Sequence, residues 1–96
     1  MIYVDPFLPA SQYIVRCYNG LTNSSAGNCG FRVSREEPGH YFIDFGFYVN
    51  DRFVSLSSTL SRNSGSVNPV GNGAVIYFHD AVKDVLADTA FYLIVY

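Results

Sequence analysis

Charge is scarce in this chain of 96 residues: Asp, Glu, Lys and Arg make up only 15% of it, against about 25% in an average soluble domain. The net charge is -2, which argues against a surface that binds the phosphates of nucleic acid. No apolar run reaches the roughly 18 residues that a membrane-spanning helix needs. The N-terminus also lacks the basic start and apolar stretch of a secretion signal. We therefore expect no nucleic-acid partner and no membrane insertion.

Catalytic and metal-binding motifs are scarce as well. The chain contains no Gly-x-Ser-x-Gly motif, and neither His40 nor His79 lies near a recognisable nucleophile. The two cysteines cannot supply the four ligands of a structural zinc site. On a helix, Asp80, Asp84 and Asp88 would share a face, but their spacing is not that of a calcium-binding loop. We expect a protein that is not an enzyme and that uses no metal or cofactor.

Apolar and aromatic residues, by contrast, are abundant: 49% of the chain is hydrophobic and 17% is aromatic. A domain of this size buries only about 60–65% of the surface that its unfolded chain exposes. Because few charges are available to cover the remainder, apolar side chains must face outward unless another chain covers them. The composition therefore predicts self-association.

Strand signals run through the whole sequence, as short segments rich in Val, Ile, Tyr, Phe and Thr between Gly, Asn, Pro and Ser. Their spacing and their polar connections favour a jelly-roll-like, antiparallel β-sandwich over a parallel sheet. We expect one domain over residues 1–96, in which residues 1–11 form an N-terminal arm or a short strand. The seven predicted strands are residues 2–4, 12–18, 30–36, 40–49, 52–60, 74–79 and 90–96.

Two longer polar stretches, residues 21–28 and 61–72, are rich in Ser, Asn and Gly. Such composition predicts exposed loops. These loops are the candidate contacts with a receptor. The residues selected in them are Thr22, Asn23, Ser24, Asn63, Ser64 and Asn68.

One segment has helical character. The apolar residues within 81–86 would fall on one helical face, and Asp80 would cap its start. A helix of at most two turns is marginal without tertiary packing. The sequence leaves open whether residues 80–87 form a short helical turn or none.

Alternation of side chains predicts which residues need a cover from outside. The expected core-facing set after His40 is Tyr41, Ile43, Phe45 and Phe47. Phe42 falls on the opposite face, and the last predicted strand is apolar on both faces. Only one face of each sheet is internal in a single sandwich, so a second copy of the chain should cover the other. The predicted subunit interface consists of Phe42, Tyr92, Ile94 and Tyr96.

Cys17 and Cys29 flank an Asn-Gly turn and a polar loop. If the strands beside them pair as a hairpin, a disulfide would close a loop of about a dozen residues and stabilise the fold by about 2–3 kcal/mol. The alternative is two unpaired thiols. The disulfide is favoured if the protein works outside cells.

Several motifs together resemble a known family. The run from Gly30 to Arg35, followed by the run from Gly39 to Phe45, resembles the "GFxVxR…GxYxIxF" pattern of C-terminal head domains of phage tail fibres and related tail-associated or collagen-like proteins. The ending from Asp88 to Val95 is similar to their "DxxFxxxV" strand, and Tyr13 to Gly20 matches their opening strand and turn. The resemblance implies a jelly-roll head that assembles as a homotrimer around an aromatic axis. It also implies contacts with other particle or tail proteins.

These observations predict a non-enzymatic structural or attachment module of a phage or phage-like particle, located on the virion or an extracellular surface. It would be a trimeric tail-fibre-type head, or a small adaptor or decoration subunit, whose loops contact a cell-surface glycan or receptor. One alternative is a carbohydrate-binding or adhesin module on a bacterial surface, whose aromatic side chains stack on sugar rings. Another is a capsid or filament subunit without a receptor role.

Overall fold

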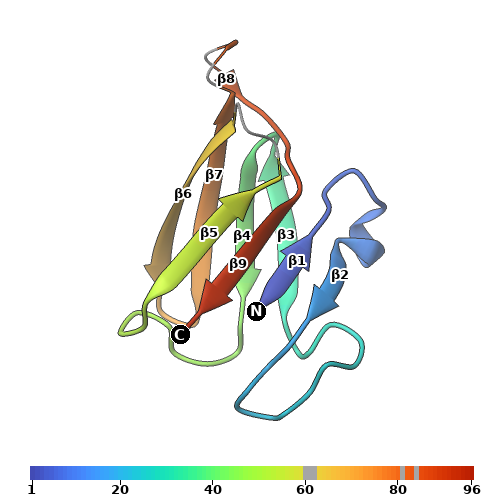
Figure 1. Ribbon diagram of the computed structural model, residues 1–96, viewed down its shortest axis with the longest axis vertical. Coiled ribbons are helices and arrows are strands. Elements are labelled where there is room, and N and C mark those ends of the chain that lie inside the picture. Colours follow the sequence, from blue (N-terminus) through green and yellow to red (C-terminus); the bar gives the residue numbers. More distant parts are fainter. Residues whose placement is uncertain (60–62, 81, 84) are drawn as a thin grey trace.

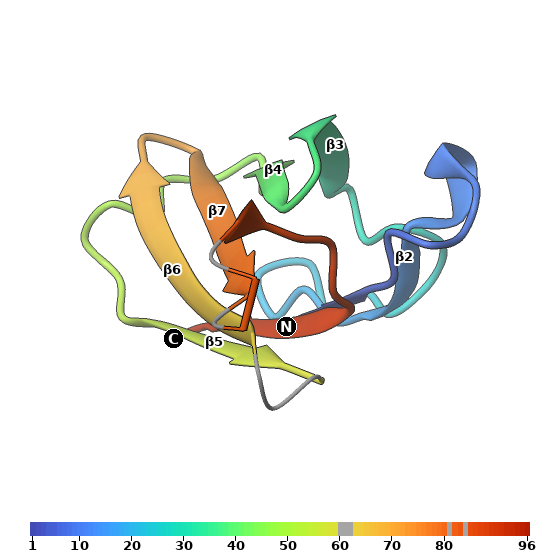
Figure 2. The same ribbon diagram turned by 90° about the horizontal axis from the view of Figure 1, so that it is seen from above.

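Two antiparallel β-sheets pack face to face in a computed structural model that describes residues 1–59, 63–80, 82–83 and 85–96. The predicted all-β sandwich is therefore confirmed. Figure 1 shows the order of the strands, and Figure 2 shows the two sheets as separate layers. Sheet I has the order β2-β1-β9-β5, and sheet II has the order β3-β4-β7-β6, with β8 also paired to β7. The chain changes sheet after β2, β4, β5 and β8.

The strands of both sheets are short, and most of them lie close to their predicted positions. Sheet I contains β1 (Ile2–Val4), β2 (Ile14–Cys17), β5 (Val54–Ser58) and β9 (Phe91–Val95). Sheet II contains β3 (Arg32–Glu37), β4 (His40–Asp44), β6 (Asn63–Val70), β7 (Gly73–Asp80) and β8 (Val85–Leu86). A 3-10 turn, η1 (Ala10–Gln12), precedes β2. No helix in the described part of the chain is long and apolar enough to cross a membrane.

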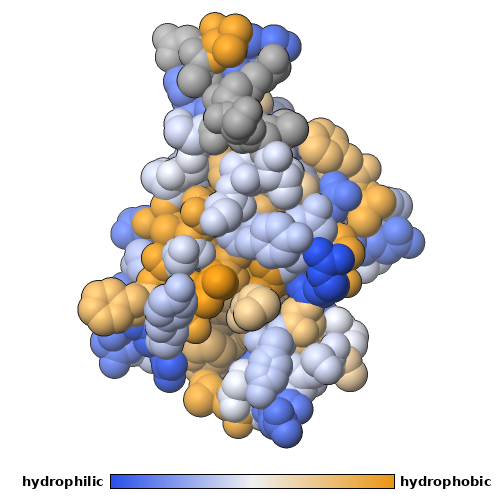
Figure 3. Space-filling view, in the orientation of Figure 1, coloured by the Kyte–Doolittle hydropathy of each residue, from blue (hydrophilic) through white to orange (hydrophobic). Residues whose placement is uncertain are grey.

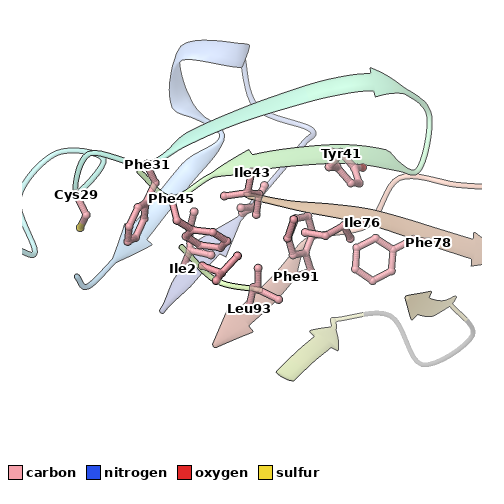
Figure 4. Packing of buried hydrophobic residues seen from close by; sticks show 13 residues of the cluster. Ile2, Cys29, Phe31, Tyr41, Ile43, Phe45, Ile76, Phe78, Phe91 and Leu93 are labelled. Atoms are coloured by element: carbon pink, nitrogen blue, oxygen red, sulfur yellow. The ribbon is translucent and has the colours of Figure 1, made fainter. Parts of the chain in front are cut away.

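The core lies between the sheets and is rich in aromatic rings (Figure 4). Phe91 of β9 packs against Phe78 of β7 and Tyr41 of β4, with ring centroids 5.0 and 5.3 Å apart. The predicted core-facing residues Tyr41, Ile43 and Phe45 are buried, and Phe47 is half-buried. Removing such rings from water supplies most of the stability of a domain this small.

The predicted strand 40–49 ends early, at Asp44. Gly46 adopts a φ of 77°, and its backbone N–H donates to the Asp44 carboxylate at 2.9 Å. This turn bends the chain out of sheet II. The alternation of residues predicted the buried face correctly but not the point at which pairing stops.

The predicted loop 61–72 is wrong over most of its length, because Asn63–Val70 is strand β6, paired along its whole length with β7. Residues 61 and 62 lie outside the described residues. At Gly65 an added Cβ would lie 2.5 Å from the ring of Phe78, so glycine makes room for a core aromatic. Pairing with the long strand β7 outweighs the weak strand propensity of a Ser-, Asn- and Gly-rich segment.

Residues 80–87, for which the sequence left open a short helical turn or none, form no helical turn in their described part. Residues up to Asp80 belong to β7, and Val85–Leu86 forms β8, which pairs back onto it. The Asp80 carboxylate accepts the backbone N–H groups of Val82 and Lys83 at 2.9 and 3.2 Å. The predicted cap residue therefore stabilises a turn between two strands instead of a helix start. Ala81 and Asp84 lie outside the described residues.

Asp88 ties together the end of the sandwich at which β3 turns into β4. Its carboxylate accepts hydrogen bonds from Nε and Nη2 of Arg35, from the hydroxyl of Tyr41 and from the backbone N–H of Gly39. Burial would raise the pKa of this carboxyl, but the hydrogen bonds from Arg35, Tyr41 and Gly39 outweigh it and lower the pKa below its ordinary value. Gly39 has a φ of 75°, and a Cβ there would lie 2.7 Å from the backbone N of Ala87. Glycine is thus required where the segment before β9 crosses this turn.

Candidate functional site

The outer face of sheet I exposes aromatic side chains and little charge. Side chains alternate along each strand, so the outward residues of its strands are few. They are Tyr3, Arg16, Ser55, Ser57, Tyr92 and Ile94, and Arg16 is the one charged member. Beyond the strand ends, Phe53 and Tyr96 are 83% and 63% exposed. Figure 3 shows this side of the molecule, where apolar patches alternate with hydrophilic residues.

One row across this face holds three stacked side chains. Tyr3 is the cross-strand partner of both Arg16 and Tyr92. The rings of Tyr3 and Tyr92 are 4.4 Å apart between centroids, and Cζ of Arg16 lies 4.7 Å from the Tyr3 centroid. Nη2 of Arg16 also donates to the Tyr92 hydroxyl at 2.9 Å. The guanidinium is therefore held in place by a cation–π contact and a hydrogen bond.

Tyr18 completes what we call the tyrosine–arginine cluster, defined as Tyr3, Arg16, Tyr18 and Tyr92. The backbone N–H of Tyr18 donates to the carbonyl of Met1 at 2.8 Å, which places it beside the row. Between these side chains lies a cleft of about 220 Å³, which Met1 and Cys17 also line. Tyrosine rings form part of the cleft wall, and Arg16 supplies a cationic edge.

No carboxylate neutralises Arg16 among the described residues. The ion pairs there join Arg35 to Asp88 and His40 to Glu37. Arg16 is exposed, and its hydrogen-bond partner Tyr92 carries no charge. A fixed positive charge consequently faces solvent on a chain whose net charge is negative.

A disulfide loop next to the cluster holds Tyr18. Cys17 and Cys29 form a disulfide, and Asn19 and Ser24 bridge the loop with two backbone hydrogen bonds. The buried Asn19 side chain donates to the carbonyl of Cys29, and the Tyr18 hydroxyl donates to the Asn23 side chain at 2.8 Å. These contacts restrict the motion of one wall of the cleft.

The two predicted contact loops do not form one surface. Thr22 and Asn23 are exposed in the disulfide loop, and Ser24 there is half-buried. The other three selected residues belong to β6, at the edge of sheet II, and are not loop residues. Those three are Asn63, Ser64 and Asn68.

The four predicted interface residues are also divided between the sheets. Tyr92, Ile94 and Tyr96 lie on the outer face of sheet I, with Ile94 half-buried. Phe42 lies on the outer face of sheet II, where its ring occupies the space above Gly73: a Cβ there would lie 2.5 Å from Cζ of Phe42. Part of the cover that Phe42 needs thus comes from its own chain.

Sequence reasoning missed Tyr3, Arg16 and Tyr18 as site residues. The strands β1, β2 and β9 were all predicted, but the pairing of β1 with the other two was not. The row exists only because β1 lies between β2 and β9. The available signal was that Arg16 lies in a predicted strand and that two other predicted strands each carry an outward tyrosine. Alternation alone places Tyr3 and Tyr92 on outward faces, but it does not place them side by side.

A larger hollow, about 950 Å³, lies between the edge strands β2 and β3. Its larger apolar lining residues are Leu8, Tyr13, Ile14, Val15, Phe31 and Val33. The β3 edge, however, carries four charged residues, Arg32, Arg35, Glu36 and Glu37, and charged side chains protect sheet edges from pairing with another strand. We therefore place the candidate site at the tyrosine–arginine cluster.

Comparison of the chain with protein-family models, with curated proteins and with solved structures finds no match. The resemblance to tail-fibre head domains therefore depends on the short sequence motifs alone.

Proposed function

We propose that this protein is a non-enzymatic attachment module of a phage or phage-like particle, exposed on the virion or an extracellular surface. The observation that carries the proposal is the outer face of sheet I, where Tyr92 and, beyond the strand ends, Phe53 and Tyr96 are exposed and where Arg16 is the one charged side chain among the described outward strand residues. Monomeric soluble domains rarely leave such a face uncovered, and faces of this kind mark interaction sites. The Cys17–Cys29 disulfide supports a location outside the reducing cytoplasm.

A homotrimer is part of this proposal. Phe53, Ile94 and Tyr96 lie at the end of sheet I where β5 and β9 pair, because the Tyr96 N–H donates to the Phe53 carbonyl and Ile94 pairs with Ser55. Packing three copies of this end around one axis would bury aromatic surface of about 150–250 Å² per ring. Phe42 lies on the opposite outer face, so it does not share this interface. Three copies would also present three contact sites. Weak binding at each site then gives tighter binding of the whole trimer to a surface.

Sedimentation equilibrium at micromolar concentration tests the assembly. We expect a trimer, and we expect Tyr96→Ser to weaken it. Tyr77→Ser is the matched control, because Tyr77 is 40% exposed on the outer face of sheet II. A wild-type monomer would contradict the trimer.

Carbohydrate binding by a bacterial surface module is the second candidate, and the tyrosine–arginine cluster favours it. Tyrosine rings beside a fixed hydrogen-bond donor are common in sites that bind a sugar ring, because the ring packs its C–H groups and the donor meets its oxygens. Glycan binding by a stable monomer would support this candidate over the particle subunit. Ordered assemblies that bind no ligand would support a capsid or filament subunit instead.

A further inference from the structure

We propose that the tyrosine–arginine cluster binds an acidic sugar, a six-membered ring that carries a carboxylate, within a surface polysaccharide. This inference rests on the proposed attachment function and names its ligand. The site is the cleft of about 220 Å³ between Tyr3, Tyr18 and Tyr92, with Arg16 at its edge.

The charge of the ligand follows from the environment of Arg16. Its guanidinium stacks on Tyr3 and uses one N–H group for Tyr92, which leaves further donors in the guanidinium plane. Two parallel N–H donors match the two oxygens of a carboxylate. Because no acidic side chain among the described residues meets Arg16, the complementary negative charge must come from outside the described residues.

The shape and polarity of the cleft favour a sugar ring over a simple anion. Tyrosines are three of the six residues that line the cleft, and it has room for about one ring. A sugar ring has an apolar C–H face that packs against an aromatic side chain and hydroxyls that bond to tyrosine hydroxyls. A phosphate group would leave the aromatic walls unused, and its greater charge is usually met by several cationic groups or by backbone N–H groups.

The site is held in shape before any ligand binds. Arg16 and Tyr18 flank Cys17, whose disulfide fixes this end of β2, and Asn23 holds the Tyr18 hydroxyl. Residues already restrained in their bound positions lose less conformational entropy on binding. A shallow surface cleft then suffices for useful affinity when several copies bind one polysaccharide.

Titration calorimetry with polysaccharides tests the inference. The probes are polygalacturonate, hyaluronate and polysialic acid, each compared with the same polymer after reduction of its carboxylates to alcohols. We expect at least one acidic polymer to bind about tenfold or more tightly than its reduced form, since a hydrogen bond between charged partners is worth that factor. Equal binding of every acidic polymer and its reduced form, or binding of none of them, would overturn the inference.

Arg16→Gln should lower the affinity for the acidic form more than the affinity for the reduced form, and so remove the preference for the acidic form. Arg32→Gln makes the same change of charge at the exposed β3 edge and should leave both affinities within about twofold of the wild type. Thermal unfolding of both variants shows that each one folds. If Arg16→Gln keeps the preference, or if the wild type binds polyphosphate as tightly as the acidic sugars, the inference is wrong.

Binding of the fluorescent protein to a panel of bacterial cells separates this inference from the proposed function. Cell binding that is equal in the wild type and in Arg16→Gln would leave the attachment function standing and overturn the acidic-sugar site. A wild type that binds neither cells nor any polymer would overturn both.

Discussion

Arg35 and Arg16 both extend from edge strands, but they have opposite surroundings. Arg35 meets a carboxylate of its own chain: its Nε and Nη2 lie 3.0 and 2.7 Å from Oδ2 of Asp88. Arg16 meets two uncharged tyrosines, one under its guanidinium plane and one at Nη2. The first positive charge is neutralised within the fold, whereas the second is held in position and left without a counter-charge among the described residues.

The difference separates a structural arginine from a candidate recognition arginine. Arg35 and Asp88 join segments that are 53 residues apart in sequence, so their contact closes one end of the sandwich. Arg16 contributes to no such closure, because its partners Tyr3 and Tyr92 are already joined by the strand pairing of β1 and β9. We therefore expect the contacts of Asp88 to contribute to the stability of the fold and those of Arg16 to contribute to ligand binding.

Removal of the disulfide beside Arg16 should have the largest effect on stability. The double variant Cys17→Ser/Cys29→Ser should lower the free energy of unfolding by about 3 kcal/mol, because the unfolded chain regains the freedom of the closed loop. Urea denaturation measures the loss, and the reduced wild type should show a similar one. Two titratable thiols in the denatured, unreduced protein would contradict the disulfide.

Replacement of the carboxylate at the Arg35 end should have the next largest effect. Asp88→Asn leaves Arg35 without its counter-charge and weakens the bonds from Tyr41 and Gly39, so we expect a loss of about 2 kcal/mol. Asp51→Asn, at an exposed turn position, is the matched control. An equal effect of the two substitutions in chemical denaturation would show that the Asp88 contacts contribute nothing to stability.

Acid should reveal the same contacts without any substitution. The pKa of Asp88 is lower in the folded chain than its ordinary value of 3.8, so its contribution is complete above pH 3.8 and is lost as the pH falls through the folded pKa. The wild type should thus lose more stability than Asp88→Asn between pH 5 and pH 2. Parallel stability profiles of the two proteins would contradict this assignment.

Much of the fold could be predicted from the sequence, because alternating and aromatic segments between turn residues indicate strands locally. Tyr41, Ile43 and Phe45 were predicted to be buried for this reason, and they are. The strand β6 could not be predicted in this way. Its glycine at position 65 is needed by the ring of Phe78, and that requirement comes from a partner strand and not from the segment itself.

The candidate site was less predictable than the fold. Tyr92 was singled out because both faces of its strand are apolar, but its partners Tyr3 and Arg16 come from the middle and the far end of the row β2-β1-β9. Local patterns give the face on which a side chain lies, whereas the order of strands in a sheet decides its neighbours. The pairing of Arg35 with Asp88 was missed for the same reason.

The smallest expected effect on stability belongs to Arg16 itself. Arg16→Gln removes a cation–π contact and one hydrogen bond at an exposed position, and such contacts contribute at most about 1 kcal/mol. Arg35→Gln, by contrast, leaves the Asp88 carboxylate, whose side chain is only 17% exposed, without its cation. Arg35→Gln should therefore destabilise the fold more than Arg16→Gln does in urea denaturation at pH 7. A larger destabilisation by Arg16→Gln than by Arg35→Gln would mean that the fold depends on Arg16. The assignment of Arg16 to ligand binding would then lose its support.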